Sequence, residues 1–186
     1  MPPKSELEML VETLRHGTAA EREDAAFNIG QLGIGPSDPD AELAVSALIE
    51  ALSDEEPDVR YEVGQSLMLL GEAAFAAIPE LLRVVAHDKD SSVRESGLWA
   101  LSGIAEGGLG PYNVQAVPLL IRALQDESEG IRGSAAITLG KLVLSDRRQF
   151  TEVLAALRQV TQDSKEERSV RLVANQAIER LSQDFT

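Results

Sequence analysis

The sequence predicts an all-α fold, an α-solenoid of five two-helix repeats wound as a right-handed superhelix. Three observations predict it. A segment centred on an arginine recurs five times, each copy follows an apolar segment of helical period, and aromatic residues make up only 4% of the chain while alanine and leucine are plentiful. Alanine and leucine favour helices, whereas aromatic and β-branched residues favour strands. We expect a single domain over residues 1–186, with repeats at about 5–33, 41–71, 74–105, 112–143 and 149–182.

The arginine-centred segments align at Arg22, Arg60, Arg94, Arg132 and Arg171, which are 34 to 39 residues apart. Small or aliphatic residues stand three, seven and ten positions after each arginine: Ala25, Ile29 and Leu32; Val63, Leu67 and Leu70; Gly97, Leu101 and Ile104; Ala135, Leu139 and Leu142; Ala174, Ile178 and Leu181. At 100° per residue, positions +3, +7 and +10 share one stripe with position −1, the buried face of a helix. Paired helices at this period indicate a solenoid.

The first helix of each repeat is predicted just before the arginine segment. In chain order these helices fall within residues 5–17, 41–54, 74–88, 112–126 and 150–163. Pro79 and Pro118 lie early in their segments, where a proline costs a helix little or bends it slightly. The longer connectors after repeats one and three, GIGPSDPD and EGGLGPYN, are expected at an edge of the solenoid, in a position to contribute to binding.

From about Ser5 to Ser182 the pattern L-x-D-x5-VR-x2-A-x3-L-x2-L resembles HEAT repeats, in particular the short HEAT-like repeats of phycobilisome lyases and of small bacterial adaptors. The resemblance implies a HEAT-type array whose second helices line the concave side. It is specific for the fold and unspecific for function. The tetratricopeptide alternative is weaker, because its tryptophan, tyrosine and proline signature positions are not met.

An acidic residue stands at a fixed place before most of the arginines. Asp54, Asp88 and Asp126 precede their arginines by six residues, whereas Asp163 precedes Arg171 by eight and the first repeat has Gly17 near this place. Each arginine is expected to bond bidentately to the aspartate of its own or an adjacent turn. The resemblance implies the same structural ladder, with members Asp54, Arg60, Asp88, Arg94, Asp126, Arg132 and Arg171. The alternative is that the arginines bind an anionic ligand.

Charge and composition exclude several classes of function. The net charge of −14 repels phosphate backbones, so nucleic-acid binding is disfavoured; the charge favours a basic partner or simply keeps the chain in solution. The absence of cysteine excludes disulfides, thiolate metal sites and cysteine nucleophiles. Because neither a signal peptide nor an apolar run of membrane-spanning length is recognised, we expect a cytoplasmic protein without membrane insertion.

Residues for catalysis are sparse, and we predict no catalytic residue, metal or cofactor. His16 and His87 stand near the ends of first helices, where the helix dipole favours histidine, and two isolated histidines make a poor metal site. Gly140-Lys141 lacks the glycine that a phosphate-binding loop needs, since Ala135 stands at that place. No His-Glu dipeptide occurs, so the di-iron chemistry of helical-repeat hydroxylases is not expected. The sequence therefore favours a protein that is not an enzyme.

The outward positions of the second helices, +1, +5 and +9, hold bulky residues where solvated ones are expected. These are Phe27, Tyr61, Trp99 and Ile137, edged by Glu23, Glu62 and Glu95. Large exposed apolar groups on a rigid wall predict a recognition groove for a protein or peptide. The alternative is that curvature or the long connectors bury part of this row.

Three functions are therefore compared. The first is a non-enzymatic scaffold or adaptor that holds a protein or peptide, a basic one among the alternatives, on its concave side. The second, implied by the resemblance, is a lyase-like or chaperone-like factor acting on bilin-carrying phycobiliproteins. The third is a purely structural array, which would need no aromatic row.

Overall fold

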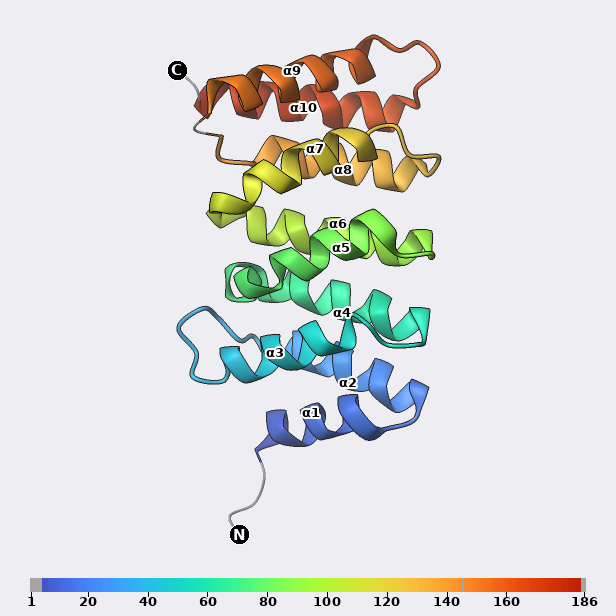
Figure 1. The fold of residues 1–186 in the computed structure, drawn as a ribbon, viewed down its shortest axis with the longest axis vertical. Helices are drawn as coiled ribbons and strands as arrows, with labels where there is room; N and C mark the ends of the chain where they lie inside the picture. The colour runs from blue at the N-terminus through green and yellow to red at the C-terminus, as the bar shows by residue number, and fades with distance from the viewer. Residues whose placement is uncertain (1–4, 145, 185–186) are drawn as a thin grey trace. The chain divides into compact units, whose positions relative to one another are not determined.

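The computed structural model describes residues 5–144 and 146–184, and folds these residues into ten α-helices without a strand (Figure 1). Contacts divide the chain into two compact units, Met1–Ile104 and Ala105–Thr186. We call them unit 1 and unit 2. The all-α repeat fold is confirmed, and the single continuous domain stays a prediction.

Unit 1 contains three helix pairs, each a first helix followed by a second. The pairs are α1 Glu6–His16 with α2 Ala19–Gln31, α3 Ala41–Ala51 with α4 Pro57–Leu70, and α5 Ile78–His87 with α6 Ser91–Ile104; a 3-10 segment, η1 Gly71–Ala77, precedes α5. Capping boxes begin the first two helices: Ser5 with Glu8, and Thr18 with Glu21. Each box satisfies backbone N–H groups that an uncapped helix start leaves unpaired.

Unit 2 contains two helix pairs. They are α7 Asn113–Ala123 with α8 Glu129–Lys141, and α9 Arg147–Gln162 with α10 Arg168–Asp184. Pro79 occupies the first turn of α5, whereas Pro118 lies inside α7. The connector EGGLGPYN is not a plain loop, because it forms the short 3-10 segments η2 Ala105–Gly107 and η3 Gly110–Tyr112 at the start of unit 2.

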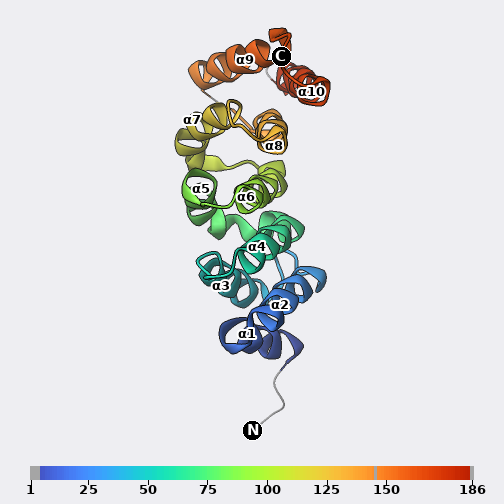
Figure 2. The ribbon, with the colours of Figure 1, turned by 90° about the vertical axis from the view of Figure 1, so that its right-hand side faces the viewer.

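In each unit the helices form two layers. In unit 1 the second helices α2, α4 and α6 pack side by side, and the first helices α1, α3 and α5 form the other layer (Figure 2). In unit 2, α8 packs on α10 and α7 lies against α9. The predicted helix-turn-helix unit is thereby confirmed in each pair, and every second helix presents one face away from the first-helix layer.

The core between the layers follows the predicted stripe. Position −1 is buried at Val59, Val93, Ile131 and Val170, and the aliphatic residues at +7 and +10 of the central repeats are buried as well. Leu32 and Ile178 are half-buried instead. Leu32 follows the last residue of α2, and Ile178 lies on α10, beyond which no further helix packs in the described residues.

Neighbouring second helices approach closely through small residues that the periodicity did not single out. A Cβ atom added to Gly30 would lie 2.6 Å from the Ser66 hydroxyl, and one added to Gly140 would lie 2.6 Å from the Cβ of Ala177. The buried Ser66 hydroxyl crosses to α2 and donates to the Ala26 carbonyl at 2.7 Å. Since a hydrogen bond to a backbone group fixes one helix against the next, these contacts set the spacing of the layer.

Candidate functional site

Two arginines of unit 1, Arg22 and Arg60, pair with the acidic turn of the following repeat. Arg60 donates through Nε and Nη2 to both carboxylate oxygens of Asp88, at 2.8 and 3.0 Å, and Arg22 does the same to Asp54, at 2.7 and 2.8 Å. Such two-point contacts are the strongest arginine–carboxylate geometry. Of the two alternatives left open above, the carboxylate of the adjacent turn is therefore the one used.

The third guanidinium nitrogen of each arginine holds its own turn through the backbone. Arg60 Nη1 donates to the Asp54 carbonyl at 2.8 Å, and Arg94 Nη1 donates to the Asp88 carbonyl at 3.1 Å. The same aspartates accept backbone N–H bonds two residues on, from Glu56 and Asp90. Arg22 and Arg60 therefore each join their own turn to the next one, an arrangement that we call the clamp, and the Asp54 carboxylate bonds Arg22 rather than Arg60.

Unit 2 has the same clamp with a glutamate in place of the aspartate. Arg132 bonds the Glu166 carboxylate through Nε and Nη2, the latter at 2.9 Å, and donates through Nη1 to the Asp126 carbonyl at 2.9 Å. Arg171 Nη1 donates to the Asp163 carbonyl at 3.2 Å, although eight residues separate them. Glu166 was missed from the sequence, because the longer last turn moves the pairing acid three residues beyond Asp163.

The electrostatics of the clamp favour its charged state. Burial alone would raise the pKa of Asp88, but the hydrogen bonds from Arg60 and from the Asp90 backbone outweigh it, so this pKa lies below its usual value. The Asp88 hydrogen bond likewise raises the pKa of Arg60. Asp54 and Arg22 shift in the same directions for the same reasons. The donors of Arg22, Arg60 and Arg132 are directed at protein acceptors, which argues against an anion site on these three residues.

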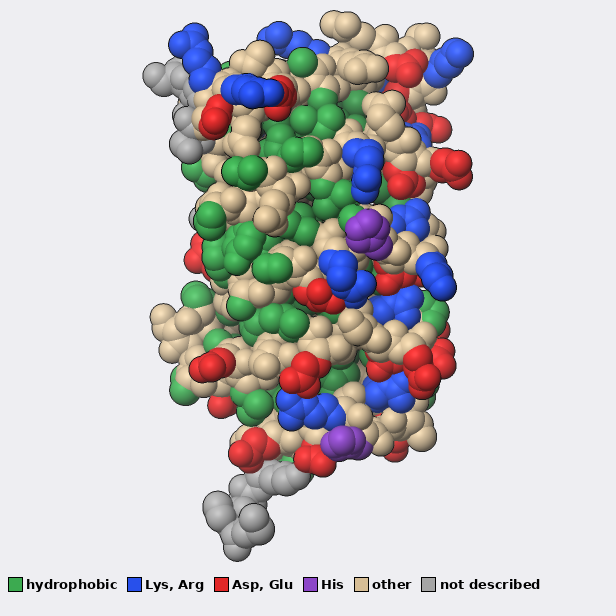
Figure 3. All heavy atoms as spheres, in the orientation of Figure 1, with side chains coloured by type: hydrophobic (Ala, Val, Ile, Leu, Met, Phe, Trp, Pro, Cys, Tyr) green, Lys and Arg blue, Asp and Glu red, His purple; other side chains and the backbone are tan. Residues whose placement is uncertain are grey.

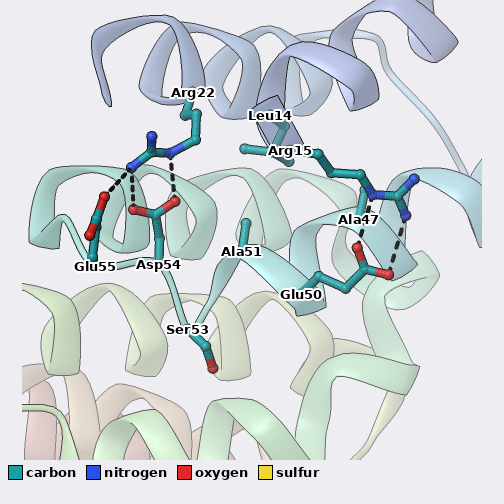
Figure 4. A pocket seen from close by; sticks show the side chains of 9 residues that line it. All are labelled: Leu14, Arg15, Arg22, Ala47, Glu50, Ala51, Ser53, Asp54 and Glu55. Atoms are coloured by element: carbon teal, nitrogen blue, oxygen red, sulfur yellow. Dashed lines mark hydrogen bonds and ion pairs between the residues drawn. The ribbon is translucent and has the colours of Figure 1, made fainter. Parts of the chain in front are cut away.

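An open hollow of about 400 Å³ in unit 1 lies beside the first clamp (Figure 4). Its charged walls are already paired, Arg22 with Asp54 and Glu55, and Arg15 with Glu50 at 3.0 and 3.2 Å. Seen from the first-helix side, acidic and basic side chains gather along the edge at which the turns lie (Figures 1 and 3). This edge is a network of ion pairs, and the hollow belongs to it.

The outward face of the second helices in unit 1 has a different character. We define the acidic–aromatic surface by six residues of that face: Glu23, Phe27, Tyr61, Glu62, Glu95 and Trp99. Phe27, on α2, is 48% exposed, whereas Tyr61 and Trp99 are half-buried. The Tyr61 ring on α4 and the Trp99 ring on α6 meet edge to face, with centroids 6.2 Å apart. The Tyr61 hydroxyl also accepts a bond from Gln65 Nε2 at 2.8 Å.

Two carboxylates of this surface are partly buried, which disfavours their charged form. Burial, and then the negative charge of Glu23 on the neighbouring helix, raise the pKa of Glu62 above its usual value. Burial also raises the pKa of Glu95. Carboxylates with raised pKa values beside exposed rings are a feature of functional sites as well as of strained surfaces. The acidic–aromatic surface is thus the strongest candidate for a binding site in unit 1.

Ile137, the fourth member of the predicted row, lies on α8 in unit 2 and is 42% exposed. The structure therefore places Phe27, Tyr61 and Trp99 on one layer of unit 1, and Ile137 on the equivalent layer of unit 2. Two exposed leucines were missed: Leu69 at position +9 of α4, and Leu172 at position +1 of α10. Both stand in outward columns, so the same periodicity could have identified them.

Features of an active site are sparse in the described residues. Residues 5–144 and 146–184 contain no group of three or more histidine or acidic side chains placed to hold a metal. His16 lies 3.7 Å from Glu12, one turn earlier on α1, and His87 ends α5. None of the described helices is long and apolar enough to cross a membrane.

Comparison with known proteins identifies the repeat. The family model for HEAT repeats matches residues 7–102, and the model for the HEAT-like repeat matches residues 91–142. No curated protein matches the chain in sequence.

Solved structures of low sequence identity share the fold. An engineered protein matches with a TM-score of 0.76 at 18% identity, over 96% of this chain and 80% of that one. A designed armadillo repeat protein in complex with the peptide (KR)4 matches with 0.73 at 19%, over 94% and 81%. The complex of CpcE and CpcF of phycocyanin lyase from Nostoc sp. PCC7120 matches with 0.67 at 22%, over 92% and 96%. At these identities the likeness concerns the fold alone.

Proposed function

Because the chain belongs to the HEAT-repeat family, we propose that it is a non-enzymatic scaffold or adaptor that binds a protein or peptide on the outward face of its second helices. The observation that carries the proposal is the acidic–aromatic surface, on which Phe27 is half exposed and the Tyr61–Trp99 pair is fixed in place. Aromatic residues with restricted side chains are preferred anchors in protein interfaces.

The ion pairs of the clamp arginines support binding on the outward face rather than at the clamp. Arg22, Arg60 and Arg132 are engaged by acidic turns in the half-buried edge of the units. On the outward face of unit 1, the Tyr61 hydroxyl accepts a hydrogen bond from Gln65 Nε2 on the same helix. A designed repeat protein of similar fold is solved with a bound peptide, which supports peptide binding by a helical repeat array of this type. The clamp is structural, and the second-helix layer carries recognition.

A selection from a random peptide display library against the purified chain tests the proposal. Peptides that bind should lose affinity on Phe27→Ala, which removes an exposed aromatic anchor without adding a charge. Met9→Ala is the matched control, because Met9 is similarly exposed but lies on α1 in the first-helix layer. Both variants should melt near the parent temperature. Selected peptides that respond to Met9→Ala and ignore Phe27→Ala would move the binding site to the other layer and overturn the proposal.

A second candidate function is supported by one comparison. The phycocyanin lyase complex aligns over 96% of its matched chain and 92% of this one, so the two arrays are similar in length as well as fold. On this candidate the chain acts on bilin-carrying phycobiliproteins as a lyase-like or chaperone-like factor. Mixing the purified chain with a bilin, and then with bilin-loaded phycobiliprotein, should change the visible absorbance spectrum of the bilin. An unchanged spectrum in both mixtures would remove this candidate.

A further inference from the structure

We infer that the acidic–aromatic surface of unit 1 binds a basic segment of its partner, with a lysine or arginine side chain held against the Tyr61–Trp99 pair and flanked by Glu62 and Glu95. This inference rests on the proposed function and names the chemistry of the partner. Its occupant is a peptide segment rich in positive charge.

The arrangement of acids and rings on three neighbouring helices is the first support. On α2, Glu23 precedes Phe27 by four residues, and on α6, Glu95 precedes Trp99 by four. Residues four apart lie on one helix face, so each pair presents a carboxylate next to a ring. Between these helices lies α4, with Tyr61 at the position equivalent to Glu23 and Glu95. At this position acid, ring and acid therefore follow one another across α2, α4 and α6, the three helices that Figure 2 shows side by side.

The chemistry of the rings is the second support. Tryptophan and tyrosine attract cations through the negative faces of their rings, and tryptophan does so most strongly. The edge-to-face contact, together with the bond from Gln65 to the Tyr61 hydroxyl, holds the ring pair before a ligand arrives. A site that is already ordered loses less conformational entropy on binding.

The charge of the surface is the third support, and it selects a basic occupant over an apolar or acidic one. The outward columns +1, +5 and +9 of α2, α4 and α6 contain no lysine or arginine. The carboxylates of Glu62 and Glu95 are partly desolvated, and Glu62 also faces the charge of Glu23. A cation from the partner would offset both the desolvation of these carboxylates and the repulsion between Glu62 and Glu23, whereas an acidic segment would increase both. The net charge of −14 acts in the same direction at longer range.

Equivalent positions in unit 2 lack this combination. Position +1 is Gly133 on α8 and Leu172 on α10, and position +5 is Ile137 and Gln176. An acid at position +1 followed by an aromatic ring at position +5 thus occurs in the first and third repeats only. The inferred site belongs to unit 1 and needs no contribution from unit 2.

Trp99 is the sole tryptophan of the chain and lies within the inferred site, so its fluorescence reports binding directly. The probe is a short peptide of alternating lysine and arginine, compared with neutral and acidic peptides of the same length at physiological ionic strength. We expect a saturable change in Trp99 fluorescence with the basic peptide alone. The double variant Glu62→Gln/Glu95→Gln should weaken this binding by about tenfold, since each lost charge contact counts for several-fold.

A matched control separates local contacts from net charge. Glu42→Gln/Glu72→Gln removes the same charge from exposed positions of unit 1, on α3 and η1, and should change the affinity by less than about twofold. Equal weakening by both double variants would show that only long-range attraction operates and would overturn the inference. No saturation, or an equal response to the neutral or acidic peptide, would overturn it too.

The outcome of the peptide selection separates this inference from the function on which it rests. Selected peptides that are apolar or acidic and lose binding on Phe27→Ala would contradict the basic partner while leaving the binding surface in place. Selected peptides that ignore Phe27→Ala would contradict both. Circular dichroism of each glutamine variant checks that the helices remain folded.

Discussion

The clamp between Arg60 and Asp88 predicts a large coupling energy between two residues that are far apart in sequence. The perturbation is Asp88→Asn, which removes the charge but keeps an oxygen for the Asp90 backbone N–H. Both charge-assisted bonds from Arg60, at 2.8 and 3.0 Å, are then weakened or lost. The guanidinium keeps only its bonds to the backbone carbonyls of Asp54 and Glu55.

The magnitude follows from the burial of the pair. An exposed ion pair contributes about 0–1 kcal/mol, and loss of one partner of a buried pair costs about 3–5 kcal/mol. The Arg60 and Asp88 side chains are only 14% and 9% exposed, which lies near the buried limit. Because some solvent reaches the pair and Arg60 keeps its carbonyl bonds, we expect a loss of about 2–3 kcal/mol in the free energy of unfolding.

The structure supplies a matched control in the same unit. Arg15 and Glu50 also join two repeats through a two-point contact, at 3.0 and 3.2 Å, but their side chains are 42% and 55% exposed. Glu50→Gln should therefore cost only about 0–1 kcal/mol. The two pairs differ mainly in burial, so the comparison isolates its effect.

The assay is denaturant unfolding of the whole chain followed by Trp99 fluorescence, which reports unit 1. Double-mutant cycles with Arg60→Ala and Arg15→Ala give the coupling energy of each pair. We expect the Arg15–Glu50 coupling to fall in high salt and the Arg60–Asp88 coupling to persist, since buried pairs are screened less. A coupling at Arg60–Asp88 no larger than that at Arg15–Glu50 would refute the account of the clamp.

Three further outcomes are expected. Gly64→Ala should lower the melting temperature and cost about 1–3 kcal/mol in the free energy of unfolding, because the added Cβ would collide with Ser96 on α6. Gly133→Ala is the control: the space around it is open, so it should be neutral or should stabilise the fold by up to about 1 kcal/mol. The lowered pKa of Asp88 stabilises the fold above its usual value of 3.8, so stability should fall as the pH drops below about 4, and Asp88→Asn should flatten this loss in acid melts. Because the pKa of Glu62 is raised, Glu62→Gln should melt higher than the parent at pH 7, and the difference should disappear below pH 4.5, where the carboxyl is protonated in both states.

The repeat and its buried face could be predicted because they depend on local periodicity. Val59, Val63 and Leu67 recur at helical spacing, and a helix with such a stripe has one way to bury it. The sequence could not show which acid Arg60 bonds, because Asp54 stands six residues before it, Asp88 stands 28 residues after it, and periodicity does not show which turn lies nearer to the guanidinium. Glu166 was missed for a different reason, since the longer last turn places the pairing acid three residues beyond Asp163.

The exposure of the candidate residues was predicted in part, whereas the site itself stays a prediction. Columns +1 and +5 identified Phe27 and Ile137, which are exposed as expected. Tyr61 and Trp99 are only half-buried partners of one another, because side chains on neighbouring helices meet across the layer, and a single-helix projection does not show this. The contacts of Gly64 depend on the same spacing between helices and were equally invisible in the sequence.

The most direct test of the central claim is a map of amide chemical shifts on titration of the labelled chain with the lysine–arginine peptide. The account predicts that the shifted signals gather on α2, α4 and α6 around Phe27, Tyr61 and Trp99, and that signals of the first helices and of the turns holding Asp54 and Asp88 stay in place. Shifts gathered at the clamp turns or on α1, α3 and α5 would contradict the separation of a structural edge from a binding layer.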